Sequence, residues 1–312
     1  MKNTKVLVTG GSGFIGSNLV KKLILDNNEV VVIDNLSSGF INNIDYLNDV
    51  KFINGDIRNI NDVKKAINGV EVVFHLAASV GNKRSIDFPS LDSEINVLGT
   101  INILDECVRE GVRKIVTSSS AGIFGELKTI PIKEDHPIEP DSPYGCSKLC
   151  AEKMCLSYSK LYDLEAVCLR YFNVYGPNQR FDAYGNVIPI FVYKMLHNET
   201  IIVYGDGNQT RDFVHVDDVV QANINSANSS GVSGAFNIAS GQRVSINQLI
   251  NLITENYKNE FKIEFVNKRP GDVLHSLADI SSARNDINFN PIVTLEKGIK
   301  DYVNWAKLFY SK

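Results

Sequence analysis

The sequence predicts an α/β fold with a doubly wound parallel sheet, and two patterns carry that prediction. Short apolar runs rich in Val and Ile alternate with segments of helical period through the first half of the chain. Runs that are apolar on both faces of a strand are typical of a parallel sheet covered by helices on both sides. The 312 residues allow one large core with a smaller lobe appended to it.

The predicted elements follow one another along the first half of the chain. The expected strands cover residues 6–9, 30–33, 51–53, 72–76, 114–118 and 166–170. The expected helices between them cover residues 15–26, 61–68, 92–110 and 144–163. Ligands of such a sheet bind at the carboxyl ends of its strands.

The rhythm of the sequence changes after about residue 175, where Pro and Gly separate shorter elements. We expect a smaller C-terminal α/β lobe there, and we expect the apolar runs 213–220 and 235–239 to return to the main sheet. The predicted division is therefore a larger domain of residues 1–175 with 212–242, and a smaller lobe of residues 176–211 with 243–312.

Composition narrows the class of protein. The net charge of −4 argues against nucleic acid or an anionic membrane surface as the main partner. No stretch approaches the ~18 apolar residues that span a bilayer, and the N-terminal apolar run is too short for a signal peptide. We therefore expect a cytoplasmic protein.

The five cysteines are odd in number and lack CxxC spacing. Cys146 and Cys150 lie one helical turn apart, which would suit a metal or redox pair, but further ligands are missing nearby. Reduced thiols and no metal site are the better interpretation.

A glycine-rich motif follows the first predicted strand and opens the first helix. Residues 9–16 read TGGSGFIG, which satisfies GxGxxG from Gly11 and GxxGxxG from Gly10. Glycines there let the backbone turn tightly and approach a pyrophosphate at the free N–H groups of the helix. A plain strand-to-helix turn also uses glycines, but the position after the first strand favours a dinucleotide site and a Rossmann domain.

Asp34 ends the second predicted strand, where a carboxylate can accept the hydroxyls of the adenine ribose. Residues 35–50 contain no Lys or Arg to neutralise a 2′-phosphate, so NAD is expected rather than NADP. The alternative for Asp34 is a solvated turn carboxylate. Asp56, after the third strand, is a weaker candidate for accepting a hydrogen bond from the adenine amino group.

Tyr144 and Lys148 lie four residues apart, on one face of a predicted helix that Pro143 starts. A phenol titrates near ~10, so it becomes a base at neutral pH only if its anion is stabilised. The ammonium of Lys148 and an oxidised nicotinamide both favour the phenolate. Ser120 follows the strand 114–119, and its hydroxyl can bond the same substrate oxygen.

At this point the sequence closely resembles the extended short-chain dehydrogenase/reductase family, and within it the nucleotide-sugar 4-epimerases. The resemblance runs almost the full length of the chain. The motifs that carry it are TGGSGFIG at 9–16, DNLSSG at 34–39, GDIRN at 55–59, HLAA at 75–78, NVLGT at 96–100, SSSAGIFG at 118–125, SPYGCSK at 142–148, LRYFNVYGPNQ at 169–179, YGDGNQTRDFVHVDD at 204–218 and RPGDVLHSLADIS at 269–281.

The resemblance implies Tyr144 as base, Lys148 as its electrostatic support and ribose ligand, and Ser120 as proton relay. The NAD-binding residues that it implies are Gly10, Gly13, Phe14, Ile15, Gly16, Asp34, Asn35, Ser37, Ser38, Gly39, Asp56, Ile57, Leu76, Ala77, Ala78, Asn96, Ser118, Tyr144, Lys148 and Tyr171. The substrate-binding residues that it implies are Ser120, Tyr144, Asn173, Val187, Tyr204, Arg211, Arg269, Asp272 and Ser276. Arg211 and Arg269 resemble a diphosphate clamp, for which guanidinium groups are suited.

The resemblance implies a UDP-hexose 4-epimerase that interconverts UDP-glucose and UDP-galactose through a 4-keto intermediate, with NAD regenerated in each turnover. A small Ser276 leaves room for an acetamido group, so UDP-N-acetylglucosamine is an alternative substrate. A nucleotide-sugar dehydratase is disfavoured because residues 121–125 carry no acid. A uronate epimerase and a catalytically silent NAD sensor are further alternatives. A homodimer through helices near 92–110 and 147–163 is expected by the same resemblance.

Overall fold

The computed structural model describes residues 1–182, 185–255, 257, 262–268 and 274–310. Its centre is a seven-stranded parallel sheet in the order β11-β6-β5-β4-β1-β2-β3. The strands are β1 (Lys5–Thr9), β2 (Glu29–Asp34), β3 (Val50–Asn54), β4 (Val72–His75), β5 (Lys114–Ser120), β6 (Glu165–Tyr171) and β11 (Gly234–Ile238). The strand order reverses between β1 and β4, and this switch point is where a doubly wound sheet binds its ligand. The predicted fold class is confirmed.

Helices cover both faces of the sheet, as the apolar strands require. The helices of the larger part are α1 (Phe14–Leu25), α2 (Ile60–Ile67), α5 (Gly99–Glu110), α6 (Pro143–Leu161) and α8 (Val216–Asn228). Along β1, Val6 and Val8 pack in one apolar cluster with α1 and α8, whereas Leu7 packs in a second cluster with α2 and α5. Successive strand residues thus feed two cores, which accounts for their unbroken apolar character.

The segment predicted as one helix over 92–110 is divided in the structure. Short helices α3 (Asn82–Asp87) and α4 (Pro89–Ser93) come first, then a π-helical turn at Glu94–Leu98, and then α5. Asn96 in the π-helical turn is buried, and its side chain bonds both backbone groups of Ser79. A π-turn adds one residue per turn and is frequent at functional sites.

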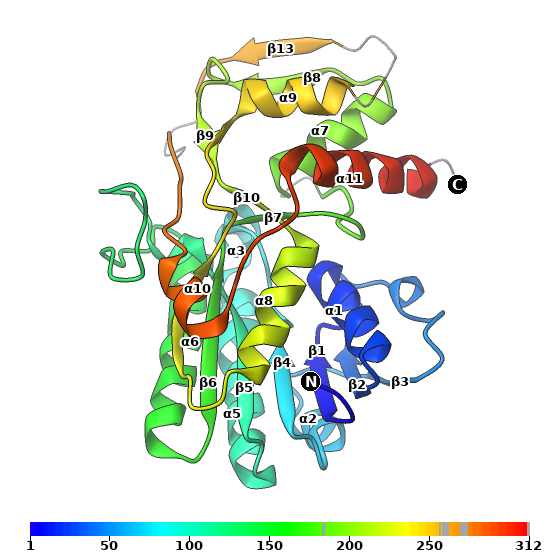
Figure 1. The fold of residues 1–312 in the computed structure, drawn as a ribbon, viewed down its shortest axis with the longest axis vertical. Coiled ribbons are helices and arrows are strands. Elements are labelled where there is room, and N and C mark those ends of the chain that lie inside the picture. Colours follow the sequence, from blue (N-terminus) through cyan, green and yellow to red (C-terminus); the bar gives the residue numbers. More distant parts are fainter. Residues whose placement is uncertain (183–184, 256, 258–261, 269–273, 311–312) are drawn as a thin grey trace.

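A smaller lobe stands above the sheet in Figure 1 and has its own apolar cluster. Its elements are α7 (Val187–Leu196), β8 (Ile201–Tyr204), α9 (Ile246–Glu255), β13 (Ile263–Val266) and α11 (Leu295–Tyr310). Strand β8 pairs in parallel with β13, and α11 packs on α7 and α9. The remaining helix, α10 (Ser281–Ile287), contacts β11.

The run 213–220 does not return to the main sheet as a strand, contrary to expectation. Residues Phe213–His215 form β10, which pairs with β7 (Asn173–Tyr175), and the following residues open α8. The reason is a helix cap, because the His215 ring accepts a hydrogen bond from the backbone N–H of Asp217 at 3.2 Å. The run 235–239 behaves as expected, since β11 pairs with β6 at the edge of the sheet.

Within the described residues no helix combines the length and apolarity needed to cross a membrane. The five cysteines are free thiols.

Candidate active site

The glycine-rich loop joins β1 to α1 at the carboxyl end of the sheet. Gly10 has a φ of +70°, and a Cβ on Gly16 would lie 2.1 Å from the Gly10 carbonyl oxygen. The loop therefore tolerates no side chain at Gly16. Gly13 is the N-cap of α1 and offers no side-chain cap, so the first N–H groups of the helix remain available to a phosphate. This loop fits a dinucleotide pyrophosphate.

Asp34 lies at the carboxyl end of β2 and faces the glycine loop. Its Oδ2 accepts a hydrogen bond from the Ser12 N–H at 2.9 Å, and its Oδ1 accepts one from the Leu36 N–H at 2.8 Å. Burial raises the pKa of Asp34, and the two amides oppose that rise. Each oxygen keeps about one lone pair free, which two ribose hydroxyls can use. Gly39 packs beside it, because a Cβ there would lie 3.0 Å from Oδ2.

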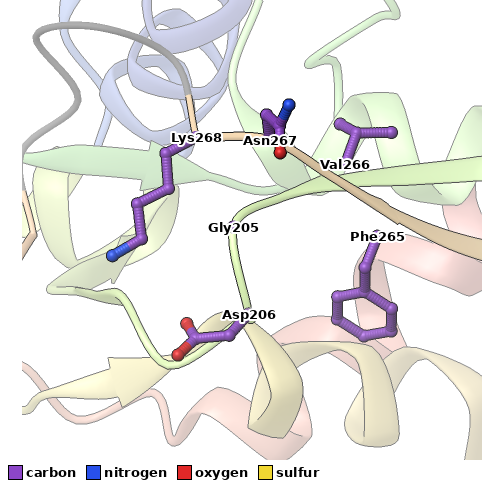
Figure 2. A pocket seen from close by; sticks show the side chains of 6 residues that line it. All are labelled: Gly205, Asp206, Phe265, Val266, Asn267 and Lys268. Atoms are coloured by element: carbon purple, nitrogen blue, oxygen red, sulfur yellow. The ribbon is translucent and has the colours of Figure 1, made fainter.

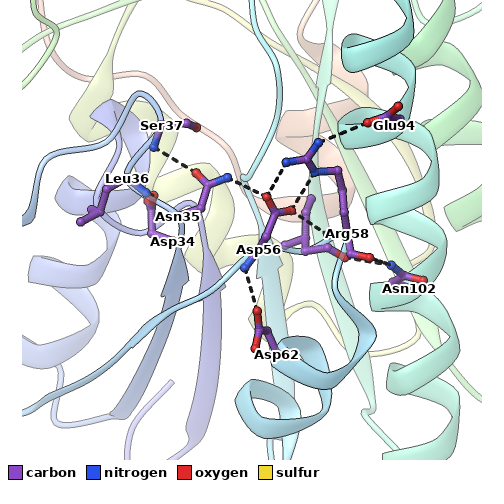
Figure 3. Close-up of polar contacts among 10 residues, drawn as sticks. Asp34, Asn35, Leu36, Ser37, Asp56, Arg58, Asp62, Glu94 and Asn102 are labelled. Carbon is purple, nitrogen blue, oxygen red and sulfur yellow. Dashed lines mark hydrogen bonds and ion pairs between the residues drawn. The ribbon is translucent and has the colours of Figure 1, made fainter.

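The Asp56 carboxylate accepts hydrogen bonds from Arg58 and Asn35, which the sequence alone does not predict (Figure 3). The Arg58 backbone N–H and Nε donate to its Oδ1, whereas Arg58 Nη2 and Asn35 Nδ2 donate to its Oδ2, at 2.8–3.0 Å. These contacts, the Arg58 side chain first, lower the pKa of Asp56 to about 2. Because a carboxylate has about four acceptor sites, the adenine amino group must displace one of these donors to bond Asp56.

The proposed catalytic residues meet where α6 passes the end of β5. Ser142 caps α6 by accepting from the Gly145 N–H, and the Tyr144 N–H donates to Ser85 Oγ. Ser120 ends β5 near the Tyr144 ring, since a Cβ on Gly122 would lie 3.3 Å from Ser120 Oγ and 3.7 Å from Tyr144 Cδ1. Burial raises the pKa of Tyr144, the nearby Ser120 hydroxyl lowers it, and the Asp92 carboxylate raises it. In the chain itself burial outweighs the other effects, so the phenol of Tyr144 is a weaker acid than a free tyrosine.

Lys148 is buried one turn further along α6. Its ammonium donates to Ser118 Oγ at 3.2 Å, and Ser118 Oγ in turn donates to the His75 carbonyl at 3.3 Å. Burial lowers the pKa of Lys148 to about 8, so the side chain remains mostly charged at neutral pH. The structure thus brings half-buried Ser118, Ser120 and Tyr144 together with buried Lys148.

A chain of buried hydrogen bonds runs behind this group. Thr9 Oγ1 contacts His75 Nδ1 at 2.8 Å, and His75 Nε2 contacts Thr100 Oγ1 at 2.9 Å. Burial, with the Lys148 charge, lowers the pKa of His75 to about 3, so the ring is neutral. Thr100 Oγ1 donates to the Asn96 carbonyl at 2.7 Å. The Asn96 side chain bonds both backbone groups of Ser79, so this chain of hydrogen bonds reaches the loop after β4.

Tyr171 is also buried, and its hydroxyl bonds the Asn223 side chain on α8. Burial raises the pKa of this phenol. Any contact with the cofactor must therefore come from its ring or backbone.

The described substrate residues that were predicted lie at the starts and ends of short elements after the main sheet. Asn173 begins β7, Val187 begins α7, Tyr204 ends β8 and Arg211 ends β9 (Thr210–Arg211), which pairs with β12 (Val244–Ser245). Ser276 is buried, and its N–H donates to the Thr210 carbonyl at 3.1 Å. Arg269 and Asp272 lie outside the described residues.

A hollow at the end of β8 and β13 adjoins Tyr204 (Figure 2). Its lining residues are Gly205, Asp206, Phe265, Val266, Asn267 and Lys268. Figure 2 shows the Asp206 carboxylate and the Lys268 ammonium on the same side of Gly205. This hollow belongs to the lobe and lies apart from Tyr144.

A family model described as the NAD dependent epimerase/dehydratase family matches residues 6–239. The chain belongs to this family. The cofactor of the family is NAD, which fits the glycine loop and Asp34. The match spans every strand of the main sheet and both residues of the YxxxK pair.

Three relatives illustrate the range of substrates within the family. A putative UDP-glucose 4-epimerase of Methanocaldococcus jannaschii is 43% identical, over 97% of this chain and 98% of its own. A UDP-glucuronate 4-epimerase of Thermodesulfobacterium geofontis is 33% identical, over 96% and 95%. The solved structure of a UDP-N-acetylglucosamine 4-epimerase from Methanobrevibacter ruminantium, in complex with UDP-N-acetylmuramic acid, is 37% identical with a TM-score of 0.94, over 100% of this chain and 99% of its own.

Some residues of this family site escaped the sequence analysis. The Arg180 guanidinium lies 3.2 Å from the centre of the Phe40 ring and 4.5 Å from that of Phe309 on α11. It also donates to Asn43, whose side chain donates to the Ser12 carbonyl in the glycine loop. The members of this contact lie far apart in sequence, and no motif marks them. The described residues contain no group of three His, Cys, Asp or Glu side chains that could hold a metal.

Proposed function

We propose that this protein is a UDP-hexose 4-epimerase that interconverts UDP-glucose and UDP-galactose. The observation that supports the proposal most is the group of Ser118, Ser120, Tyr144 and buried Lys148 at the carboxyl end of β5. A phenol, a hydroxyl and an ammonium at one point can remove and return the proton of a sugar alcohol.

The residues divide the work as follows in this proposal. Tyr144 takes the proton of the C4 hydroxyl, and Ser120 hydrogen-bonds the same oxygen as its charge changes. Lys148 holds positive charge near the phenolate and orients the nicotinamide ribose. Bound NAD would supply hydride exchange at C4, held by the glycine loop and Asp34. The flat 4-keto sugar would turn before the hydride returns, so the hydride would come back on the other face of C4 while Tyr144 returns the proton to the oxygen, with no net redox change.

The residues that bind the nucleotide sugar in this proposal are those that the family resemblance implies. Arg211 and Arg269 contact the diphosphate, Asn173 a phosphate oxygen, and Asp272 the ribose. Val187 and Tyr204 are further substrate-binding residues of this proposal. An acidic chain needs such local cations to hold a diphosphate.

A second candidate substrate is UDP-N-acetylglucosamine. It is supported by the small side chain at Ser276, whose backbone N–H bonds the Thr210 carbonyl of β9, because a small residue there would accommodate a C2 acetamido group. A dehydratase is less well supported, because the turn Ala121–Ile123 after Ser120 carries no acid. A uronate epimerase is a further alternative on this fold.

The test is to incubate the purified protein separately with UDP-galactose and UDP-N-acetylgalactosamine, without added NAD, and to separate the products by chromatography. The proposal expects the C4 epimer of the first, and the second candidate expects the C4 epimer of the other. Tyr144→Phe provides the inactive control. A 4-keto-6-deoxy product, or no reaction with either sugar by a protein that retains NAD, would overturn the epimerase assignment.

The homodimer also remains a proposal. Leu98, Leu161 and Tyr162 are exposed apolar side chains on the helices expected to form the interface. Light scattering of the purified chain tests this proposal.

A further inference from the structure

Asp92 is a buried carboxylate behind the proposed catalytic pair. It lies on α4 and is 1% exposed. Its Oδ2 accepts a hydrogen bond from Ser147 Oγ at 2.5 Å, whereas its Oδ1 is buried without a hydrogen-bond partner among the described residues. A buried carboxylate oxygen without a partner is costly, so its presence calls for a physical reason.

Ser147 connects Asp92 to the turn of α6 that carries the reactive groups. It lies between Tyr144 and Lys148 in the sequence and contacts the Tyr144 carbonyl at 3.1 Å. The same hydroxyl accepts a hydrogen bond from Asn96 Nδ2 at 3.0 Å. Asp92 on α4 and Asn96 in the π-helical turn therefore both hydrogen-bond the Ser147 side chain in this turn of α6.

The other ionisable groups near Lys148 are either compensated or neutral. Glu152 on α6 accepts Arg170 Nε and Nη2 at 3.0 and 2.8 Å, and also the Ser119 hydroxyl. His75 on β4 is neutral, because burial and the Lys148 charge lower its pKa to about 3. The bond with Cys155 on α6, together with burial, raises the pKa of Cys168 on β6 and keeps that thiol neutral.

Asp92 is therefore the uncompensated carboxylate of this neighbourhood within the described residues. Burial lowers the pKa of Lys148, whereas Cys155 and then Asp92 raise it; the Asp92 charge also raises the pKa of Tyr144. No ion pair joins Lys148 to a carboxylate in the described part of the chain, so Asp92 acts on it through space.

We propose that Asp92 is a positioning residue: through Ser147 it fixes the turn of α6 that carries Tyr144 and Lys148, and its negative charge balances the Lys148 ammonium. This inference rests on the proposed function for its activity test. It assigns Asp92 no contact with the sugar or with NAD.

The deciding variant is Asp92→Asn, which keeps an oxygen for Ser147 and removes the charge. Loss of a negative charge lowers the pKa of both Tyr144 and Lys148. We expect both limbs of the kcat/KM profile to move to lower pH by about one pH unit. A purely structural role would lower kcat at every pH and leave both limbs in place, and that result would overturn the charge assignment.

Two further variants separate charge from position. Ser147→Ala removes the hydrogen bond but keeps the carboxylate, so kcat should fall about tenfold while the limbs move less than with Asp92→Asn. Asp92→Glu keeps the charge, so its limbs should stay near those of the unmodified protein. If Ser147→Ala leaves kcat unchanged, the anchoring part of the proposal is wrong.

A titration without sugar distinguishes this inference from the proposed function. In the NAD complex, the tyrosinate absorbance of the chain minus that of its Tyr144→Phe variant reports Tyr144 alone. The same difference measured in the Asp92→Asn background should titrate at lower pH. This result would support the inference even if no UDP-sugar is epimerised, and an unchanged titration would contradict it even if epimerisation is found.

Discussion

The ammonium of Lys148 on α6 lies 3.2 Å from the hydroxyl of Ser118 on β5, two residues before this strand ends at Ser120. This contact joins the helix that carries Tyr144 to the strand that carries Ser120. Together with the Ser119–Glu152 hydrogen bond, this contact helps to set the position of Tyr144 relative to Ser120.

Lys148→Met tests the double role of that lysine. The variant removes the charge that favours the phenolate and a ligand of the nicotinamide ribose, so kcat should fall by at least about 100-fold and NAD should bind more weakly. The exposed Lys160→Met on the same helix is the control. Full activity of Lys148→Met would rule out the assigned role. Steady-state kinetics and NAD content of the purified variants are the measurements.

Arg58→Met should make the protein less stable near neutral pH and leave its stability at low pH unchanged. Asp56 has its pKa lowered to about 2 from 3.8, mainly by Arg58, so this interaction stabilises the folded state above about pH 4. The stabilisation is lost as the pH falls through the range 4 to 2. Since both side chains are partly exposed, it is worth less than about 1 kcal/mol. Urea midpoints of both proteins at pH 6 and pH 2.5 test this, and a gap that widens in acid would contradict it.

Gly16→Ala should destabilise the protein far more than Gly13→Ala. The added methyl of the first would lie 2.1 Å from the Gly10 carbonyl oxygen, whereas that of the second would lie 3.2 Å from the same atom. Forcing the loop apart should cost about 1–3 kcal/mol and weaken NAD binding. Thermal denaturation of the two variants measures the difference. Equal stability of both would show that the loop relaxes freely.

Ser276→Val tests the pocket proposed for the sugar C2 substituent. The bulkier side chain should reduce turnover of UDP-N-acetylgalactosamine at least tenfold relative to UDP-galactose, because the acetamido group needs the space. Ser276→Ala, which leaves the space open, should change the ratio little. Competition between the two sugars in one reaction gives the ratio directly. An unchanged ratio for Ser276→Val would place the C2 substituent elsewhere.

The parts of the site that local sequence determines were predictable. The Val and Ile runs located the strands, and TGGSGFIG located the tight turn that Gly10 and Gly16 require. Features made by distant residues were not. The Arg58 side chain occupies acceptor sites on both oxygens of Asp56, and its conformation cannot be read from the sequence motif. Asp92 and Ser147 are 55 residues apart, so only packing of α4 on α6 reveals their bond.

Two local features also escaped, for physical reasons. The π-helical turn at 94–98 keeps the apolar pattern of a helix over too few residues to show its different period. The run after Phe213 has the composition of a strand, but the His215 cap turns it into a helix.

The stacking of Arg180 between Phe40 and Phe309 has a thermodynamic consequence. Phe309 in the last turn of α11 contacts Arg180, and Arg180 bonds Asn43. Asn43 in turn bonds the Ser12 carbonyl of the glycine loop. Coupling between two sites is reciprocal. If the contact with α11 increases the affinity for the dinucleotide, binding of the dinucleotide stabilises α11 by the same free energy. Amide hydrogen exchange in α11, near the C-terminus, should therefore slow when the dinucleotide binds at the glycine loop near the N-terminus.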